Sequence, residues 1–275
     1  MTGDTDCVGL LQWALPRLGL RWPGFRRVRG QVCKRIDRRI HTLGISGPAA
    51  YMAYLSEHPE EWKVLDGLCT VSISRFYRDR AVFDYLGDAV LPTLARRATE
   101  RSERTVRCWS AGCASGEEPY TLNLIWRQRM SLQFPLATLT IVATDFDACL
   151  LDRARVACYS RSSLKELPHA WIGEAFMCQG NECCLRDAWR TGVEFRQQDI
   201  RQDQPAGPFD LVLCRNLAFT YFDSSMQLRI LERLAERISA AGYLVVGRYE
   251  TVPSGAPFIS CAPGLGVYQR VPWPG

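Results

Sequence analysis

Residues 108–119 combine two glycines, several small residues and two adjacent carboxylates, and they carry the clearest chemical signal of the chain. The β-prone run Thr105–Trp109 leads into this segment, and a helical pattern begins near Glu117. A strand, a tight loop and a helix N-terminus in this order present free backbone N–H groups to a ligand. Gly112 and Gly116 can adopt positive φ and let a ligand approach the main chain closely. The segment therefore predicts a ligand-binding loop.

The charge of this loop indicates which ligand it fits. Glu117 and Glu118 would repel a phosphate group, and no lysine follows the glycines, so the loop is not a P-loop. Carboxylates at this place suit a cationic ligand. S-adenosylmethionine, which carries an ammonium and a sulfonium group, fits better than a nucleotide polyphosphate. The loop alone leaves open that this is an ordinary strand–helix turn of another α/β protein.

Two further predicted strands end in polar residues. Thr138–Ala143 reads as a strand that is followed by Asp145, roughly 20–30 residues after the glycine loop, where such folds bind ribose hydroxyls. Phe209–Cys214 reads as a buried strand that stops at Asn216. Polar residues just beyond a parallel strand lie in the ligand crevice of an open α/β sheet. Both ends therefore add candidate ligand contacts.

The elements that must position these residues alternate between strand and helix over residues 85–275. Further strands are expected at 193–195 and 242–247, and helices at 117–130, 148–157 and 224–239 with Gly242 as the helix stop. Such alternation predicts a mostly parallel sheet with helices on both faces. The alternation lapses over residues 160–192, and the Pro/Gly-rich tail from Pro253 onward is expected to be irregular.

Residues 1–84 read as a separate helical domain that carries most of the positive charge. Between Arg17 and His41 there are nine Lys or Arg side chains against one Asp, a net charge of +8, whereas the whole chain has +5. The apolar residues of this segment follow helical spacing: Val28, Val32, Ile36, Ile40 and Leu43. Off that face lie Arg27, Lys34, Arg38 and His41. They form either the solvated face of a docked helix or a docking surface for an acidic partner. Nucleic acid is a weaker alternative, because no aromatic stacking motif accompanies the charge.

Composition agrees with an enzyme that buries a full core, with 47% apolar and 23% charged residues among 275. No uncharged apolar run is long enough to span a bilayer, and the start lacks a basic segment typical of a signal peptide. These features predict a cytoplasmic protein. Its twelve cysteines are therefore expected to be reduced. No metal site is expected, because Cys-x-x-Cys pairs are absent and the three histidines have no paired spacing with the cysteines.

Five stretches together resemble the CheR-type chemotaxis receptor methyltransferases, which are protein-glutamate O-methyltransferases. These stretches are Ser72–Asp79, Trp109–Tyr120, Ala143–Asp147, Phe209–Asn216 and Tyr221–Asp223. The resemblance extends from about Leu18 to about Val252. It implies an α/β fold, with a Rossmann-like S-adenosylmethionine-dependent methyltransferase domain behind an N-terminal helical domain. It also implies that the basic helix faces the acidic helical stalk of a chemoreceptor.

The resemblance further implies the site residues. Those that match cofactor-binding positions of the family are Ser72, Ser74, Arg78, Gly112, Glu117, Asp145, Asp199, Ile200, Asn216 and Leu217. Arg78 and Tyr221 match the residues near the transferring methyl group and are the catalytic candidates. At Ser72 the family commonly has asparagine, so this contact is shortened or lost.

Departures from the family pattern lie on the acceptor side of the expected site. Four residues, 217–220, separate Asn216 from Tyr221, where the family usually has three. Residues 247–250 read Gly-Arg-Tyr-Glu instead of Gly-His-Ser-Glu. The family inserts a small antiparallel subdomain at 160–192, which in some members grips a receptor's C-terminal peptide; here it is short and cysteine-bearing. These departures leave two alternatives: a stand-alone methyltransferase for a small molecule or another protein, and a non-catalytic S-adenosylmethionine-binding adaptor.

Overall fold

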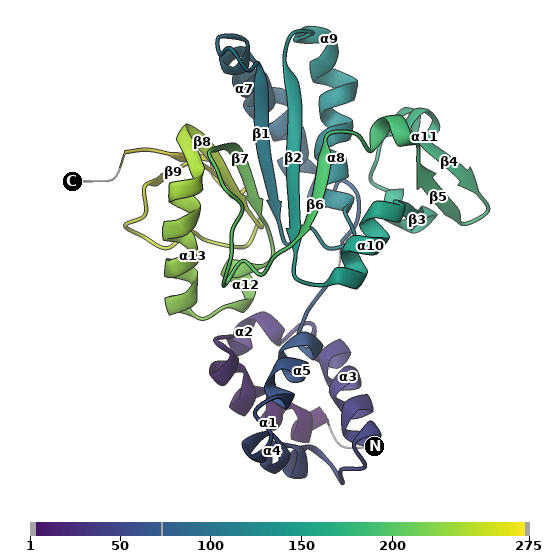
Figure 1. Ribbon diagram of the computed structural model, residues 1–275, viewed down its shortest axis with the longest axis vertical. Helices are drawn as coiled ribbons and strands as arrows, with labels where there is room; N and C mark the ends of the chain where they lie inside the picture. Colours follow the sequence, from purple (N-terminus) through teal and green to yellow (C-terminus); the bar gives the residue numbers. More distant parts are fainter. Residues whose placement is uncertain (1–3, 73, 273–275) are drawn as a thin grey trace. The chain divides into compact units, whose positions relative to one another are not determined.

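The computed structural model describes residues 4–72 and 74–272, with side chains from Asp6 onward. The described chain divides into two compact units (Figure 1). Residues up to Ser72, together with Thr220–Gln227, form the smaller unit, and the remaining residues form the larger one. The division in the N-terminal part lies between Ser72 and Ile73, whereas the sequence analysis placed it between residues 84 and 85.

The smaller unit is helical, as its apolar spacing predicts. Its elements are α1 (Asp4–Ala14), η1 (Leu15–Leu18), α2 (Trp22–Phe25), α3 (Arg29–Thr42), α4 (Pro48–Glu57) and α5 (Glu61–Leu68). Helix α3 is the predicted basic helix, and it buries Val32, Ile36 and Ile40. An ion pair joins α3 to α5, because the Arg39 guanidinium donates to both carboxylate oxygens of Glu61 at 2.9 and 2.7 Å. These hydrogen bonds lower the pKa of Glu61 against the opposing effect of burial.

The larger unit is built on a seven-stranded sheet with the order β6-β2-β1-β7-β8-β10-β9 (Figure 1). Five strands are parallel: β1 (Thr105–Ala111), β2 (Thr138–Asp145), β6 (Val193–Gln197), β7 (Phe209–Cys214) and β8 (Ile238–Val246). Strand β7 is buried at every position, as expected of a strand covered on both faces. The predicted mostly parallel sheet is confirmed.

Helices connect the strands along the chain. In chain order they are α6 (Arg80–Tyr85), η2 (Leu86–Val90), α7 (Leu91–Thr99), α8 (Glu117–Ile125), η3 (Trp126–Met130), α9 (Ser131–Gln133), α10 (Ala148–Val156), α11 (His169–Ala175), α12 (Ala218–Tyr221) and α13 (Ser224–Arg237). The strand order proceeds in one direction from β1 to β2 and in the other from β7 to β8. Because parallel crossovers are right-handed, this reversal places α8 and α13 on opposite faces. The reversal also marks the point where ligands bind in such sheets.

Two expectations for the C-terminal part are wrong. Helix α13 ends at Arg237, and Gly242 lies inside β8 instead of stopping the helix. A Cβ at Gly242 would lie 3.0 Å from the main-chain oxygen of Asp210, so this glycine permits close approach of β8 to β7. The tail is also ordered, because β9 (Phe258–Ala262) and β10 (Val267–Arg270) extend the sheet in the antiparallel direction.

A second, three-stranded antiparallel sheet lies between α10 and β6, within the region where the alternation lapses. Its strands are β3 (Cys158–Ser160), β4 (Phe176–Gln179) and β5 (Glu182–Leu185), in the order β3-β5-β4. The two short 3₁₀ turns η4 (Arg161–Leu164) and η5 (Asp187–Trp189) flank it. The antiparallel subdomain implied by the family resemblance is thus present.

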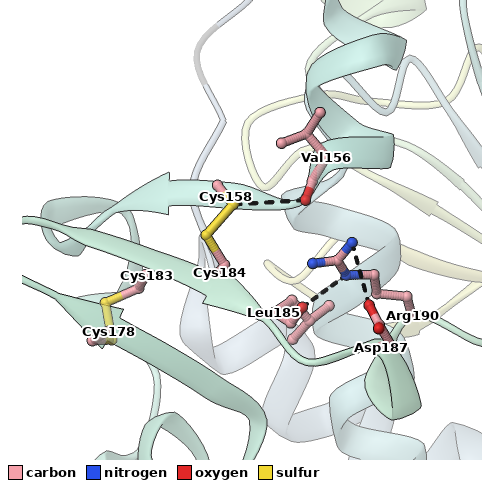
Figure 2. Close-up of a disulfide and its surroundings, with 8 residues drawn as sticks. All are labelled: Val156, Cys158, Cys178, Cys183, Cys184, Leu185, Asp187 and Arg190. Carbon is pink, nitrogen blue, oxygen red and sulfur yellow. Dashed lines mark hydrogen bonds and ion pairs between the residues drawn. A yellow bond between two sulfur atoms is a disulfide. The ribbon is translucent and has the colours of Figure 1, made fainter.

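Six cysteines form disulfides, so the expectation of reduced thiols is wrong for them. In the small sheet Cys158 bonds Cys184, and Cys178 bonds Cys183 (Figure 2). The cysteines of each pair lie directly opposite each other on neighbouring strands. The third disulfide joins Cys7 of α1 to Cys33 of α3. Sequence spacing did not reveal these pairs, because strand pairing and helix packing bring the thiols together.

Removing the long-loop disulfide of the small sheet is expected to lower the free energy of unfolding by about 3–4 kcal/mol. Cys158 and Cys184 are separated by 26 residues, and a cross-link over that span strongly restricts the unfolded chain. The double substitution Cys158→Ala and Cys184→Ala tests this by guanidinium unfolding of oxidised protein. In the matched control, Cys178→Ala with Cys183→Ala, a separation of 5 residues gives a smaller loss of about 2 kcal/mol. Equal losses would contradict the loop-length argument.

In the part of the chain that the structure describes, no helix is both long enough and apolar enough to span a bilayer.

Candidate functional site

Most predicted cofactor residues of the larger unit lie at the carboxyl ends of neighbouring strands of its sheet, which Figure 1 shows as arrows. Gly112 follows β1, Asp145 ends β2, Asp199 and Ile200 follow β6, and the pair 216–217 follows β7. These four strands are neighbours in the order β6-β2-β1-β7, and all are parallel. Their carboxyl ends therefore meet where open α/β sheets bind ligands.

The glycine loop after β1 has the conformation that the sequence predicts. Gly112 and Gly116 have φ of 74° and 91°, and Ala114 between them has 48°. The main-chain N–H of Gly112 donates to the Thr144 oxygen at 2.8 Å, which turns the loop over the end of β2. A Cβ at Gly112 would lie 2.6 Å from the Leu217 side chain. The loop after β1 and the loop after β7 thus approach each other closely, and any other residue at Gly112 would be strained by the positive φ and would displace the Leu217 side chain.

Glu117 begins α8 and places a buried carboxylate beside the glycine loop. Both of its carboxylate oxygens accept from the Ser115 hydroxyl at 3.1 Å, and Ser74 donates a further side-chain hydrogen bond. Burial raises the pKa of Glu117, while the hydrogen bonds act in the opposite direction. Ser74 and Glu117, which were predicted from separate motifs, therefore lie together. A buried carboxylate of this kind favours a cationic group.

Affinity for S-adenosylmethionine is expected to fall several-fold as the pH is lowered from neutral toward ~5. Because burial raises the pKa of Glu117, its carboxylate takes up a proton at a higher pH than an exposed glutamate does. Protonation removes the negative charge that attracts the ammonium or sulfonium group. Calorimetric titration over this pH range measures the effect, with Glu117→Gln as control. An equally steep pH dependence in Glu117→Gln would contradict the assignment.

Asp145 lies buried at the end of β2 and is joined to the glycine loop. Its Oδ2 accepts the Ala114 N–H at 2.8 Å, and its Oδ1 accepts the Asp147 N–H at 3.1 Å. Burial raises the pKa of Asp145, and these main-chain N–H groups counteract the shift. The Phe146 N–H is a third main-chain donor to this carboxylate, which offers about four lone pairs in all, so Asp145 can hold the loop and still accept a ribose hydroxyl.

Replacing Asp145 by alanine is expected to weaken cofactor binding by about 1–3 kcal/mol, the typical contribution of hydrogen bonds to a charged group. The loss includes the hydrogen bond that fixes Ala114 in the loop. Calorimetric titration with S-adenosylhomocysteine measures it. Asp152→Ala on α10 is the control, because Asp152 is an exposed aspartate that pairs with Arg155. A similar loss in both variants would contradict a specific role for Asp145.

The remaining candidates of the larger unit have defined partners. The Arg78 guanidinium donates to the Asn216 side-chain oxygen at 3.4 Å, so two residues far apart in sequence meet. Asp199 pairs with Arg201 at 2.7 Å, and Ile200 is buried beside it in the chain. Arg78 and Asn216 thus form a polar pair, and the cofactor contacts of Asp199 and Ile200 stay predictions.

The sequence analysis missed Glu250 as a supporting residue. Its buried carboxylate accepts the main-chain N–H of Asn216 at 2.8 Å and that of Gly247 at 2.6 Å. Asn216 has a φ of 54°, in the left-handed region that asparagine tolerates better than most residues, and Glu250 fixes its main chain there. The glutamate retained at the end of the altered Gly-Arg-Tyr-Glu segment was the available signal.

Ser72 and Tyr221 belong to the smaller unit. Tyr221 is held there by α2 and the residue that precedes it: its main-chain oxygen accepts the Arg21 N–H at 2.8 Å, and its ring meets Phe25 edge to face at 5.1 Å. A Cβ at Gly24 would lie 2.3 Å from the Thr220 oxygen, so the segment fits closely against α2. The catalytic role of Tyr221 and the cofactor contact of Ser72 stay predictions.

The parallel sheet and the carboxylate-bearing glycine loop at its carboxyl edge define a Rossmann-like methyltransferase fold. Residues 72–262 match the family described as CheR methyltransferase, SAM binding domain. The chain therefore belongs to the CheR methyltransferase family, and it is an S-adenosylmethionine-dependent methyltransferase. The resemblance noted in the sequence is confirmed, as is S-adenosylmethionine as the cofactor.

Individual relatives differ in length. The chain is 31% identical over 226 residues to chemotaxis protein methyltransferase 2 of Pseudomonas aeruginosa, covering 80% of this chain and 77% of that protein. It is 29% identical over 223 residues to an uncharacterized 104.1 kDa protein of Rhodobacter capsulatus, of which it spans only 23%. Among solved structures, the N-methyltransferase NodS from Bradyrhizobium japonicum in complex with S-adenosyl-L-homocysteine aligns with 14% identity and a TM-score of 0.32, over 58% of this chain and 61% of NodS.

Proposed function

We propose that this methyltransferase esterifies glutamate carboxylates of a chemoreceptor-like protein in the cytoplasm. The observation that carries the acceptor is the basic face around α3, defined by Arg27, Lys34, Arg38 and His41. All four side chains are exposed, whereas the apolar residues of the same helix are buried. A concentrated positive surface suits a large acidic acceptor. The name of the Pseudomonas relative, a chemotaxis protein methyltransferase, agrees with this choice.

Two arginines of this segment stabilise the fold and lie outside the basic face. Arg35 donates to the main-chain oxygens of Leu68 and Thr70, and Arg39 pairs with Glu61, so these two hold the helices together. The side chains of the basic face are exposed, whereas Val32, Ile36 and Ile40 are buried. The exposure of the basic face supports a binding role, because holding the fold uses other arginines.

Methyl transfer to a carboxylate requires the protein to position the reactants and does not require proton transfer. S-adenosylmethionine supplies an activated methyl group, whose carbon–sulfur bond breaks, with the electron pair remaining on sulfur, as the acceptor oxygen bonds to carbon. A glutamate carboxylate is already ionised at neutral pH, so no general base is needed. Arg78 can orient that carboxylate by a charge-assisted hydrogen bond. Correct alignment alone can contribute about 7–11 kcal/mol to lowering the barrier.

The described residues fit the cofactor. Glu117 provides the buried negative charge for its cationic end, and Asp145 an acceptor for its ribose. The glycine loop adds a close approach to the main chain at Gly112. Arg78 and Asn216, whose side chains meet at 3.4 Å, lie where the methyl group is expected, and the role of Tyr221 stays a prediction from the family resemblance.

One observation favours a second acceptor class. Four residues separate Asn216 from Tyr221, where the family usually has three, and residues 218–221 form the short helix α12. Two further departures, Arg248 and Tyr249, are exposed, Tyr249 to 87%. A changed acceptor wall suits a stand-alone methyltransferase for a small molecule or another protein. A non-catalytic adaptor is less favoured, because the Arg78–Asn216 contact is intact.

Calorimetric titration with S-adenosylmethionine and S-adenosylhomocysteine, followed by methyl labelling of chemoreceptor cytoplasmic fragments, tests the proposal. We expect binding, and labelled protein that releases volatile methanol on treatment with alkali, the property of a carboxyl methyl ester. Binding without labelled fragments would move the acceptor to the small-molecule class. Labelling that resists alkali would reject a carboxyl acceptor.

A further inference from the structure

Arg215 has a buried guanidinium at the carboxyl end of β7, one residue before Asn216. Its side chain is 2% exposed. One terminal nitrogen, Nη1, donates to Glu118 at 3.1 Å. The other, Nη2, donates to the Asp79 carboxylate at 2.7 Å and to the Arg78 main-chain oxygen at 2.9 Å. The guanidinium also lies over the Phe83 ring, 5.0 Å from its centre.

These contacts join three segments that are distant in sequence. Asp79 comes from the segment before α6, Glu118 from the first turn of α8, and Arg215 itself from the end of β7. Glu118 is fixed in turn, because it accepts the Ser110 hydroxyl at 2.8 Å. The rigid, planar guanidinium holds its partners in a defined geometry, which a flexible lysine cannot do.

The main chain around Arg78 has a conformation that requires such support. Tyr77 and Asp79, on either side of Arg78, have φ of 58° and 62°. Non-glycine residues in this left-handed region are held there by their surroundings, at a cost of about 1–3 kcal/mol each. Arg215 contacts both the main-chain oxygen of Arg78 and the side chain of Asp79. It therefore holds the turn that presents the Arg78 side chain.

We infer that Arg215 is a positioning residue for methyl transfer, setting the relative places of Arg78 and Asn216. It holds the main chain of the first and directly precedes the second, and the two side chains meet at 3.4 Å. This inference rests on the proposed function in one respect, the assignment of Arg78 and Asn216 to the cofactor site. The competing explanation is a buried ion network that only stabilises the fold.

A compensated variant separates these explanations. Arg215→Met alone leaves two carboxylates without their cation and is expected to lower the melting temperature. Adding Asp79→Asn and Glu118→Gln removes the uncompensated charge, and the melting temperature is expected to recover. The affinity of this triple variant for S-adenosylhomocysteine, measured by calorimetry, is expected to stay about tenfold or more below that of the wild type. Its kcat is expected to stay about 100-fold below, because Arg78 and Asn216 are no longer held in their relative positions. Recovery of stability and affinity together would overturn the inference.

The matched control is the ion pair at the opposite end of the same strand. Arg101 donates to both carboxylate oxygens of Asp210, at 2.9 and 3.0 Å, where β7 begins. Arg101→Met with Asp210→Asn is expected to leave cofactor affinity unchanged. Equal losses of affinity in the control and the compensated variant would also overturn the inference, since they would show a general effect of removing an ion pair.

Arg215→Lys keeps the charge and provides a test that does not depend on recovery of the triple variant. We expect near-wild-type stability with reduced affinity, because lysine cannot contact Glu118, Asp79 and the Arg78 oxygen in the same geometry. Full affinity in Arg215→Lys would reject the positioning role. If wild-type protein binds no S-adenosylhomocysteine, the proposed function fails and the inference with it. Normal wild-type binding with unaffected variants rejects the inference alone.

Discussion

Arg78→Ala is expected to lower the rate of methyl transfer about 100-fold or more while leaving the fold intact. The Arg78 side chain is only partly buried and reaches Asn216, whereas its main chain is held independently by Arg215. Truncation therefore removes the group that orients the acceptor without releasing the turn. Steady-state kinetics with labelled S-adenosylmethionine measures the effect, and kcat is expected to fall more than cofactor affinity.

Arg75 is the matched control for Arg78. It lies three residues earlier in the same motif, and its guanidinium pairs with Glu166 at 2.9 Å on the surface. Arg75→Ala removes the same charge from the same segment, so it is expected to retain most of the activity. A near-wild-type rate in Arg78→Ala, or an equal loss in Arg75→Ala, would reject the catalytic assignment of Arg78.

The parallel sheet was predictable because its signals are local. Each apolar run that is followed by polar residues or glycine predicts one strand, and the residues that follow the run mark the end of the strand where a ligand binds. Gly112, Asp145 and Asn216 could therefore be placed at a common edge from the sequence alone. The antiparallel strands β9 and β10 gave no comparable signal, because they are short and lie in a segment rich in proline and glycine. They join the sheet because β10 pairs with β8 and β9 pairs with β10.

The support of the site was not predictable in the same way. Arg215 is 136 residues from Asp79 and 97 from Glu118, so no spacing reveals that one guanidinium joins them. The two disulfides of the small sheet also follow from strand pairing that sequence separation does not encode. Residue types at strand ends thus predict what a ligand contacts, whereas the residues that hold those contacts in place follow from tertiary packing.

Reversing the charge of the basic face is expected to lower kcat/KM for an acidic receptor fragment by about 10–1,000-fold. The variant carries Arg27→Glu, Lys34→Glu and Arg38→Glu. All three side chains are exposed, and the apolar face of α3 that packs the helix is unchanged. The fold and the cofactor affinity are therefore expected to persist. Long-range attraction to the acceptor is replaced by repulsion, which acts mainly on the rate of encounter.

A second charge reversal controls for the change in net charge. Arg104, Lys165 and Arg186 are exposed residues of the larger unit, and replacing them by glutamate changes the total charge by the same amount. The loss should be confined to the basic-face variant. It should also diminish at high salt, because mobile ions screen interactions between exposed charges beyond about 10 Å at 0.1 M. Equal losses in both variants, or an equal loss with a small uncharged acceptor, would show that α3 does not select an acidic protein. The basic face would then be an ordinary solvated helix surface, and the small-molecule alternative would be favoured.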